Sequence, residues 1–103
     1  IQQKTIPLLL SNTTDLVGLA KTGTGKTAAF GLPILQLIDT NLPAIQAVIL
    51  VPTRELGHQI FSNLENFAKY LPQVSIAATC GGIPIKPQIE RLSLPTHIVV
   101  ATP

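Results

Sequence analysis

The chain reads AKTGTGKT from Ala20 to Thr27, a glycine-rich turn that follows an apolar run and precedes a helical pattern. Glycines let successive backbone N–H groups point at phosphate oxygens, where a Cβ would block the approach. The helix adds the positive end of its dipole. Lys26 can reach β- and γ-phosphates, and the Thr27 hydroxyl can bind Mg²⁺. The pattern therefore predicts a nucleotide-phosphate site at residues 20–27.

The alternative is a chance glycine-rich turn. The general phosphate-loop pattern has Gly six residues before the Lys, and Ala20 stands at that position. A strand and a helix are nevertheless expected on the two sides of the turn, which is the context that the motif requires. We therefore favour phosphate binding.

Four apolar runs predict the strands of a parallel sheet: residues 15–20, 46–51, 74–80 and 97–101. The second and fourth runs lack polar alternation, which is typical of strands covered on both faces. Helical patterns cover residues 1–10, 26–39, 54–70 and 86–92. The first three strands start about 30 residues apart, the length of a right-handed βαβ unit. We expect one α/β layered domain over residues 1–103.

The helix expected at residues 54–70 has the clearest signals. Its apolar residues recur every three or four positions, which is one stripe on a helix surface. Thr53 is a natural N-cap before it, and Pro72 follows its end. The stripe consists of Leu56, Ile60, Leu64, Phe67 and Leu71.

Small, hydroxylated, glycyl or basic residues follow each predicted strand. Parallel strands end at one edge of the sheet, where open α/β sheets bind ligands. Three of the seven Lys and Arg residues lie in these segments against one acid, Glu55, which favours an anionic ligand. The segments are residues 21–27, Pro52–Glu55, Gly81-Gly82 and Thr102-Pro103.

Two of these features are open to two interpretations. Arg54 opens a helix, where the dipole opposes a cation, so it is either a solvated side chain or a ligand-binding one. Gly81-Gly82 is either a simple turn or a place where a phosphodiester backbone approaches main-chain N–H groups.

The composition excludes several classes of protein. Hydrophobic residues make up 46% and charged residues 12%, which argues against disorder. No apolar run approaches the ~18–20 residues of a membrane span, and no signal peptide is visible. A single cysteine, Cys80, excludes an internal disulfide and is compatible with a reducing compartment. We interpret it as a buried apolar side chain, and His58 and His97 as structural. The chain has no Met, so we expect it to be a piece of a longer one.

Taken together, these segments resemble the first RecA-like domain of DEAD-box ATP-dependent RNA helicases, which are P-loop NTPases with a three-layer fold. Ile1-Gln2 with Ile6-Pro7 resembles the end of the Q motif, and residues 20–27 resemble motif I, where the family itself has Ala first. The remaining resemblances are Pro52–Leu56 (PTREL) with Gln59 to motif Ia, Gly81-Gly82 to the GG motif, and Thr102-Pro103 to the start of motif Ib.

The resemblance implies roles for particular residues. Gln2 would bind the adenine edge, and the loop would hold ATP through Ala20, Lys21, Thr22, Gly23, Thr24, Gly25, Lys26 and Thr27. Lys26 and Thr27 would be the catalytic residues, with Thr27 on Mg²⁺. The RNA backbone would be bound, without base reading, by Pro52, Thr53, Arg54, Gly81, Gly82, Thr102 and Pro103.

The resemblance also implies what lies outside these residues. A second RecA-like domain of the same chain would close on ATP and RNA, hydrolysis would drive local duplex unwinding, and the protein would be cytoplasmic with no membrane partner. Gly57 departs from the family, which usually has Ala there. The adenine-stacking aromatic residue would precede Ile1 and the acidic motif would follow Pro103. For the 103 residues alone we expect weak nucleotide binding and no hydrolysis.

Two rival functions remain. One is a P-loop DNA helicase or translocase, against which PTREL and Gln2 argue. The other is a non-catalytic module that binds nucleotide or nucleic acid, which a Lys26→Ala substitution in the longer protein distinguishes.

Overall fold

The computed structural model describes residues 1–11 and 15–103, in two compact units that comprise residues 1–37 and 38–103. None of the helices in these described residues is both long and apolar enough to cross a membrane.

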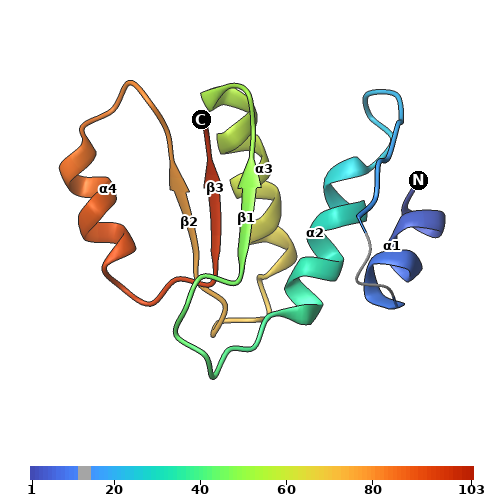
Figure 1. Ribbon diagram of the computed structural model, residues 1–103, viewed down its shortest axis with the longest axis horizontal. Helices are drawn as coiled ribbons and strands as arrows, with labels where there is room; N and C mark the ends of the chain where they lie inside the picture. Colours follow the sequence, from blue (N-terminus) through green and yellow to red (C-terminus); the bar gives the residue numbers. More distant parts are fainter. Residues whose placement is uncertain (12–14) are drawn as a thin grey trace. The chain divides into compact units, whose positions relative to one another are not determined.

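The first unit contains two helices packed against each other, α1 (Gln2–Ser11) and α2 (Lys26–Leu37) (Figure 1). Both predicted helices are thus confirmed. Each contains a proline, Pro7 or Pro33, and α2 buries its Pro33 ring together with Ala29 and Leu35. Burial of these apolar residues holds the helix despite the backbone hydrogen bond that a mid-helix proline removes.

The strand predicted at residues 15–20 is not present, so that prediction is wrong. Val17 and Leu19 are 86% and 92% exposed. A strand exists only where a neighbouring strand receives its backbone hydrogen bonds, and the described sheet pairs only the other three runs. Apolar composition alone therefore predicted more sheet than the structure forms.

The second unit contains a parallel sheet of β1 (Ala47–Leu50), β2 (Ile76–Thr79) and β3 (Ile98–Ala101), in the order β1-β3-β2. The strands are in register: Ala47 and Ile76 both lie opposite Ile98. These three predicted strands are confirmed.

Two helices connect the strands, α3 (Arg54–Phe67) between β1 and β2, and α4 (Ile85–Leu92) between β2 and β3 (Figure 1). Through α3 the chain passes from β1 to β2 at the opposite edge of the sheet, and through α4 it returns to β3 in the centre. Because both crossovers are right-handed, the reversal places the helices on opposite faces. Helix α3 packs on β2 and β3, and it buries Ile60 and Leu64, while β3 buries Ile98 and Val100.

Burial differs between the central and edge strands. All three apolar residues Ile98–Val100 of β3 are buried, as predicted for a strand covered on both faces. The same prediction is wrong for β1, where Val48 and Leu50 are 60% and 68% exposed. They alternate with the half-buried Ala47 and Ile49, so they share one face of the sheet, and α4 packs on β2, the strand at the opposite edge. One face of β1 therefore remains uncovered in the described unit.

The starts of the three strands are tied together by His97. Its carbonyl accepts the N–H groups of Gln46 and Ala47 at 2.8 and 3.2 Å, and its N–H donates to Ser75 O at 2.9 Å. The buried imidazole accepts the Ser75 N–H through Nδ1 at 3.0 Å. The structural role predicted for His97 is confirmed, and Cys80 is buried as expected.

Helix α3 begins where predicted and ends earlier. The Thr53 hydroxyl accepts the Leu56 N–H at 3.2 Å, which is the expected N-cap. The helix ends at Phe67, because Leu71 N bonds back to Ala68 O at 2.8 Å in a turn. Of the predicted stripe, Ile60 and Leu64 are buried, and the residues at its two ends are about 40% exposed.

Candidate functional site

The loop before α2 depends on glycine at two positions. Gly23 and Gly25 have φ values of +78° and +81°, a region that residues with a Cβ rarely adopt. At Gly25 space is restricted as well, because an added Cβ would collide with the Gln2 side-chain amide. The loop therefore folds close to α1 with its backbone uncovered, as a phosphate cradle requires.

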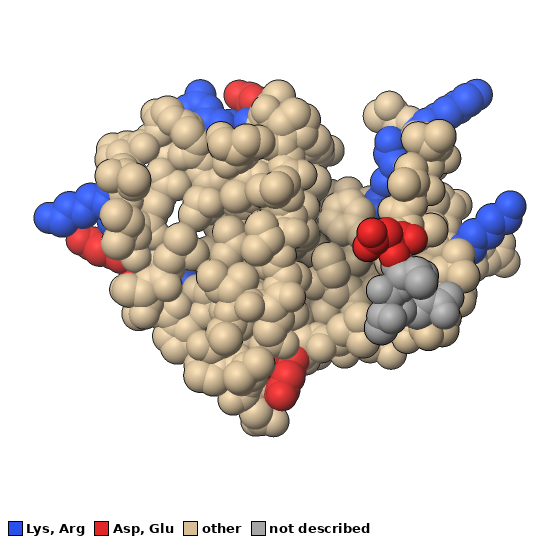
Figure 2. Space-filling view, in the orientation of Figure 1, with Lys and Arg blue, Asp and Glu red and all other residues tan. Residues whose placement is uncertain are grey.

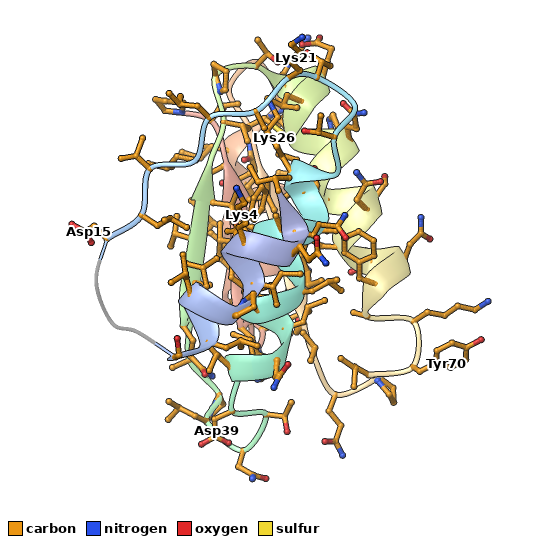
Figure 3. The ribbon with its side chains drawn as sticks, turned by 90° about the vertical axis from the view of Figure 1, so that its right-hand side faces the viewer. Lys4, Asp15, Lys21, Lys26, Asp39 and Tyr70 are labelled. Carbon is orange, nitrogen blue, oxygen red and sulfur yellow. The ribbon has the colours of Figure 1, made fainter. Side chains whose placement is uncertain are left out.

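Lys26 makes one hydrogen bond across this loop. It is the first residue of α2, and its ammonium donates to Ala20 O at 2.9 Å, across the turn. Inside the turn, the Thr24 hydroxyl donates to Lys21 O at 2.7 Å. Figure 3 shows Lys21 and Lys26 at the end of the unit where α2 begins. An ammonium has three donors, so Lys26 retains two N–H groups for a further acceptor.

Gln2 is joined to the same loop. Its Nε2 donates to Gly25 O at 3.3 Å, and the same carbonyl accepts the Ala29 N–H of α2 at 3.1 Å. Beside this bond is an open hollow of about 680 Å³, lined by Gln2, Thr24, Ile1, Gln3, Ile6 and Pro7. The hollow is mainly apolar with an amide at its border, a surface that suits a flat heteroaromatic ring.

The residues of this unit fit a nucleoside triphosphate better than they fit a metal ion alone. Asp15 is the only acid in residues 1–37, and Figure 3 shows it away from Lys21 and Lys26. Residues 1–11 and 15–103 contain no cluster of three His, Cys, Asp or Glu side chains. Mg²⁺ usually keeps waters and substrate phosphates as most of its ligands, so the half-buried Thr27 fits as a single protein ligand.

The second unit gathers the other predicted residues at the carboxyl ends of its strands. Gly81 N donates to the Thr102 hydroxyl at 3.1 Å, and Thr102 N donates to Thr79 O at 3.1 Å. Gly82 has φ +81°, and a Cβ on it would lie 3.0 Å from Nη1 of Arg54. The Arg54 guanidinium thus lies against the glycine turn.

The remaining members of the predicted RNA-binding set border this cluster. Pro52 and Thr53 precede α3 and are exposed, as is Pro103 after Thr102. The Thr53 oxygen is already used as the cap of α3. Gly82 N–H has no acceptor among the described residues, whereas the Gly81 N–H is bound to Thr102. The structure therefore brings three segments, from β1, β2 and β3, to one edge.

The phosphate loop of the first unit and the strand ends of the second unit carry few charges, and most of these are positive. The helices α2 and α3 each begin with a cation, Lys26 or Arg54, where the helix dipole disfavours it. A bound anion relieves this repulsion at either helix. Figure 2 shows that most of the visible surface carries no charge, in keeping with seven basic and five acidic residues.

Sequence reasoning missed Gln88. The residue lies in α4, outside the predicted motifs, but its side chain accepts the Cys80 N–H at 2.9 Å and donates to Cys80 O at 3.1 Å. No local signal marks it. Pro84 at the N-cap of α4 makes no side-chain cap, and the partners of Gln88 are backbone groups four to eight residues earlier, in the turn before the helix.

Comparisons with known proteins agree with this arrangement. The DEAD/DEAH box helicase family model matches residues 1–103. The ATP-dependent RNA helicase DbpA of Escherichia coli K12 is 46% identical over 103 residues, which are 100% of this chain and 22% of that protein. For DEAD-box ATP-dependent RNA helicase 12 of Arabidopsis thaliana the identity is 45%, over 100% of this chain and 20% of the relative. The chain thus spans about a fifth of the length of these relatives.

Solved structures give the same result. A hypothetical ATP-dependent RNA helicase from Sulfolobus tokodaii superposes with TM-score 0.83 at 42% identity, over 98% of this chain and 28% of that one. A yeast DEAD-box splicing factor superposes with TM-score 0.87 at 32% identity, over 99% and 26%. The predicted RecA-like α/β fold with a parallel sheet is confirmed.

Proposed function

The chain belongs to the DEAD/DEAH box helicase family, and on that premise we propose that it is part of the ATP-binding RecA-like domain of an ATP-dependent RNA helicase. In the full-length protein, ATP hydrolysis is coupled to local unwinding of RNA duplexes. The observation that carries the proposal is the Gly25 carbonyl, which joins Gln2 to the phosphate loop and to α2.

ATP binds to the first unit. Backbone N–H groups of residues 21–27 surround the phosphates, and the Lys26 ammonium exchanges its bond to Ala20 O for phosphate oxygens. The Gln2 amide, already fixed beside the loop, binds the adenine edge. The Thr27 hydroxyl is the protein ligand of Mg²⁺, which neutralises phosphate charge when bound.

RNA binds to the edge of the second unit through its backbone. The Arg54 guanidinium pairs with a phosphate, and the uncommitted Gly82 N–H donates to a neighbouring oxygen. The Thr102 hydroxyl accepts a hydrogen bond from Gly81 N, and its own hydrogen remains free to donate to the backbone of the same RNA strand. None of these groups reads a base edge, so binding is independent of RNA sequence.

The proposal extends beyond the described residues in two ways. A second RecA-like domain of the same chain takes part, because the relatives are about five times longer. We place the protein in the cytoplasm, a reducing compartment with which the free, buried thiol of Cys80 is compatible. Residues 1–103 alone bind nucleotide weakly and do not hydrolyse it, since few acids are present to orient Mg²⁺ or water.

Unwinding by the full-length protein tests the proposal. RNA and DNA duplexes of equal sequence are compared side by side with ATP, in the wild type, Lys26→Ala and Lys4→Ala. We expect RNA to be unwound by the wild type and by Lys4→Ala, an exposed lysine on α1 (Figure 3). Lys26→Ala should fold normally, because only one exposed hydrogen bond is lost, but should not unwind.

The rival functions give different outcomes in the same assay. Unwinding of DNA alone would favour a DNA helicase or translocase. No ATP-dependent unwinding by the wild type, with Lys26→Ala unchanged from it, would favour a module without catalysis.

A further inference from the structure

The turn that connects β2 to α4 is held at both ends by one side chain, Gln88. Its Oε1 accepts the Cys80 N–H at 2.9 Å, and its Nε2 lies 3.1 Å from Cys80 O. The same Nε2 lies 3.3 Å from Ile83 O and 3.2 Å from Pro84 O. Cys80 precedes the two glycines of the turn and Ile83 follows them, so the amide closes a ring around Gly81-Gly82.

The chemistry of this contact requires an amide. The partner of Oε1 is a backbone N–H, and the three partners of Nε2 are all carbonyls, so only one orientation of the side chain satisfies the site. Two N–H hydrogens are shared among three acceptors. A glutamate would face the carbonyls with a negative oxygen, and an apolar isostere would leave both backbone groups of Cys80 without this partner.

The turn that Gln88 closes is the one that Arg54 contacts. Within the turn, Gly81 N–H is bound to Thr102 and Gly82 N–H has no acceptor among the described residues. Gln88 itself is half-buried and bonded to the backbone, so it does not take part in binding directly. It makes no hydrogen bond to either glycine among the described residues and holds the backbone on the two sides of them.

We propose that Gln88 is a positioning residue of the RNA-binding edge, which holds the Gly81-Gly82 turn in the conformation that presents the Gly82 N–H beside Arg54 to the RNA backbone. This inference depends on the RNA-binding role proposed above. A flexible loop loses conformational entropy when a ligand fixes it, and this loss lowers affinity. If the turn is already ordered before RNA binds, less entropy is lost and the affinity is higher.

The test measures single-stranded RNA binding by the full-length protein at several salt concentrations. The variants are Gln88→Met, which is close in shape, and Gln88→Glu, with Arg91→Lys as the matched control. Arg91 lies on the same helix but bonds Thr96, Ser75 and Ile76 O at the opposite end of the strands. Its replacement destabilises the unit while keeping the charge.

We expect Gln88→Met to raise the Kd for RNA about 3- to 10-fold, the effect of about one hydrogen bond, and Gln88→Glu to raise it more. The KM for ATP should not change. Because no charge is lost in Gln88→Met, its dependence on salt should equal that of the wild type, whereas Arg54→Ala should reduce the slope by about one. Arg91→Lys should lower the Tm without changing the Kd.

Two outcomes overturn the inference in distinguishable ways. If Arg54→Ala weakens RNA binding but Gln88→Met does not, or weakens it only as much as Arg91→Lys at equal loss of Tm, Gln88 is merely structural. If the wild type binds no RNA, the proposed function fails and the inference fails with it. Should Gln88→Glu prove too unstable to measure, Gln88→Met alone decides the question.

Discussion

Replacing Gly82 by alanine perturbs the RNA-binding edge at a position where both the backbone conformation and a neighbouring side chain oppose an added Cβ. The φ value of +81° is unfavourable for a residue with a Cβ by about 1–2 kcal/mol. The added Cβ would also lie 3.0 Å from Nη1 of Arg54. The guanidinium is the far end of a flexible side chain, so it moves away with little further loss of stability.

The expected magnitudes follow from these two effects. The free energy of unfolding should fall by about 1–2 kcal/mol, and each kcal/mol corresponds to roughly 2–4 °C in Tm for a domain of 150–250 residues, larger than the 103 residues of this chain. A hydrogen bond to a charged group contributes about 1.5–3 kcal/mol. Displacing Arg54 should therefore weaken RNA binding by the full-length protein by up to about tenfold.

The assays are thermal unfolding and RNA binding by fluorescence anisotropy. Gly81→Ala serves as the stability control, because Gly81 has no positive φ and a Cβ there meets nothing within 4 Å. We expect the Tm of that control to match the wild type. The reasoning is refuted if Gly82→Ala shows the Tm of Gly81→Ala and binds RNA as tightly as the wild type.

Three further substitutions test the other contacts. Gly25→Ala should raise the KM for ATP more than Gly23→Ala, because both strain the loop but only the first displaces Gln2; equal KM values would contradict this. Thr53→Ala should lower the free energy of unfolding by about 1 kcal/mol through loss of the α3 N-cap, with Thr53→Ser close to the wild type in chemical denaturation. Arg54→Ala should weaken RNA binding for all sequences alike, and an effect limited to one RNA sequence would disprove a phosphate contact.

Local signals predicted most of the elements. Thr53 marks the start of α3 because its side-chain oxygen accepts an N–H of the first helical turn that has no partner within the helix. The two groups are only three residues apart, so the signal can be read from the local sequence. The strands β1, β2 and β3 were predictable because their apolar runs end at glycine, proline or hydroxylated residues. The phosphate loop was predictable because its glycines have positive φ values that few other residues adopt.

Features that depend on partners were not predictable from local signals. The run at residues 15–20 is apolar after Asp15, but apolar character does not supply a neighbouring strand. Val48 and Leu50 likewise resemble core residues, and their exposure depends on where α4 packs. Gln88 escaped notice because its function depends on a turn six to seven residues earlier that only the fold brings into contact.

The central claim is that ATP at the phosphate loop and RNA at the Arg54 edge belong to one coupled reaction. The most direct measurement is the RNA affinity of the full-length protein with and without a non-hydrolysable ATP analogue, in the wild type and in Lys26→Ala. We predict that the analogue tightens RNA binding of the wild type by about 5- to 150-fold, the usual range of such coupling, and leaves Lys26→Ala unchanged. Equal RNA affinity of the wild type with and without the analogue, at concentrations where the analogue is bound, would contradict the account.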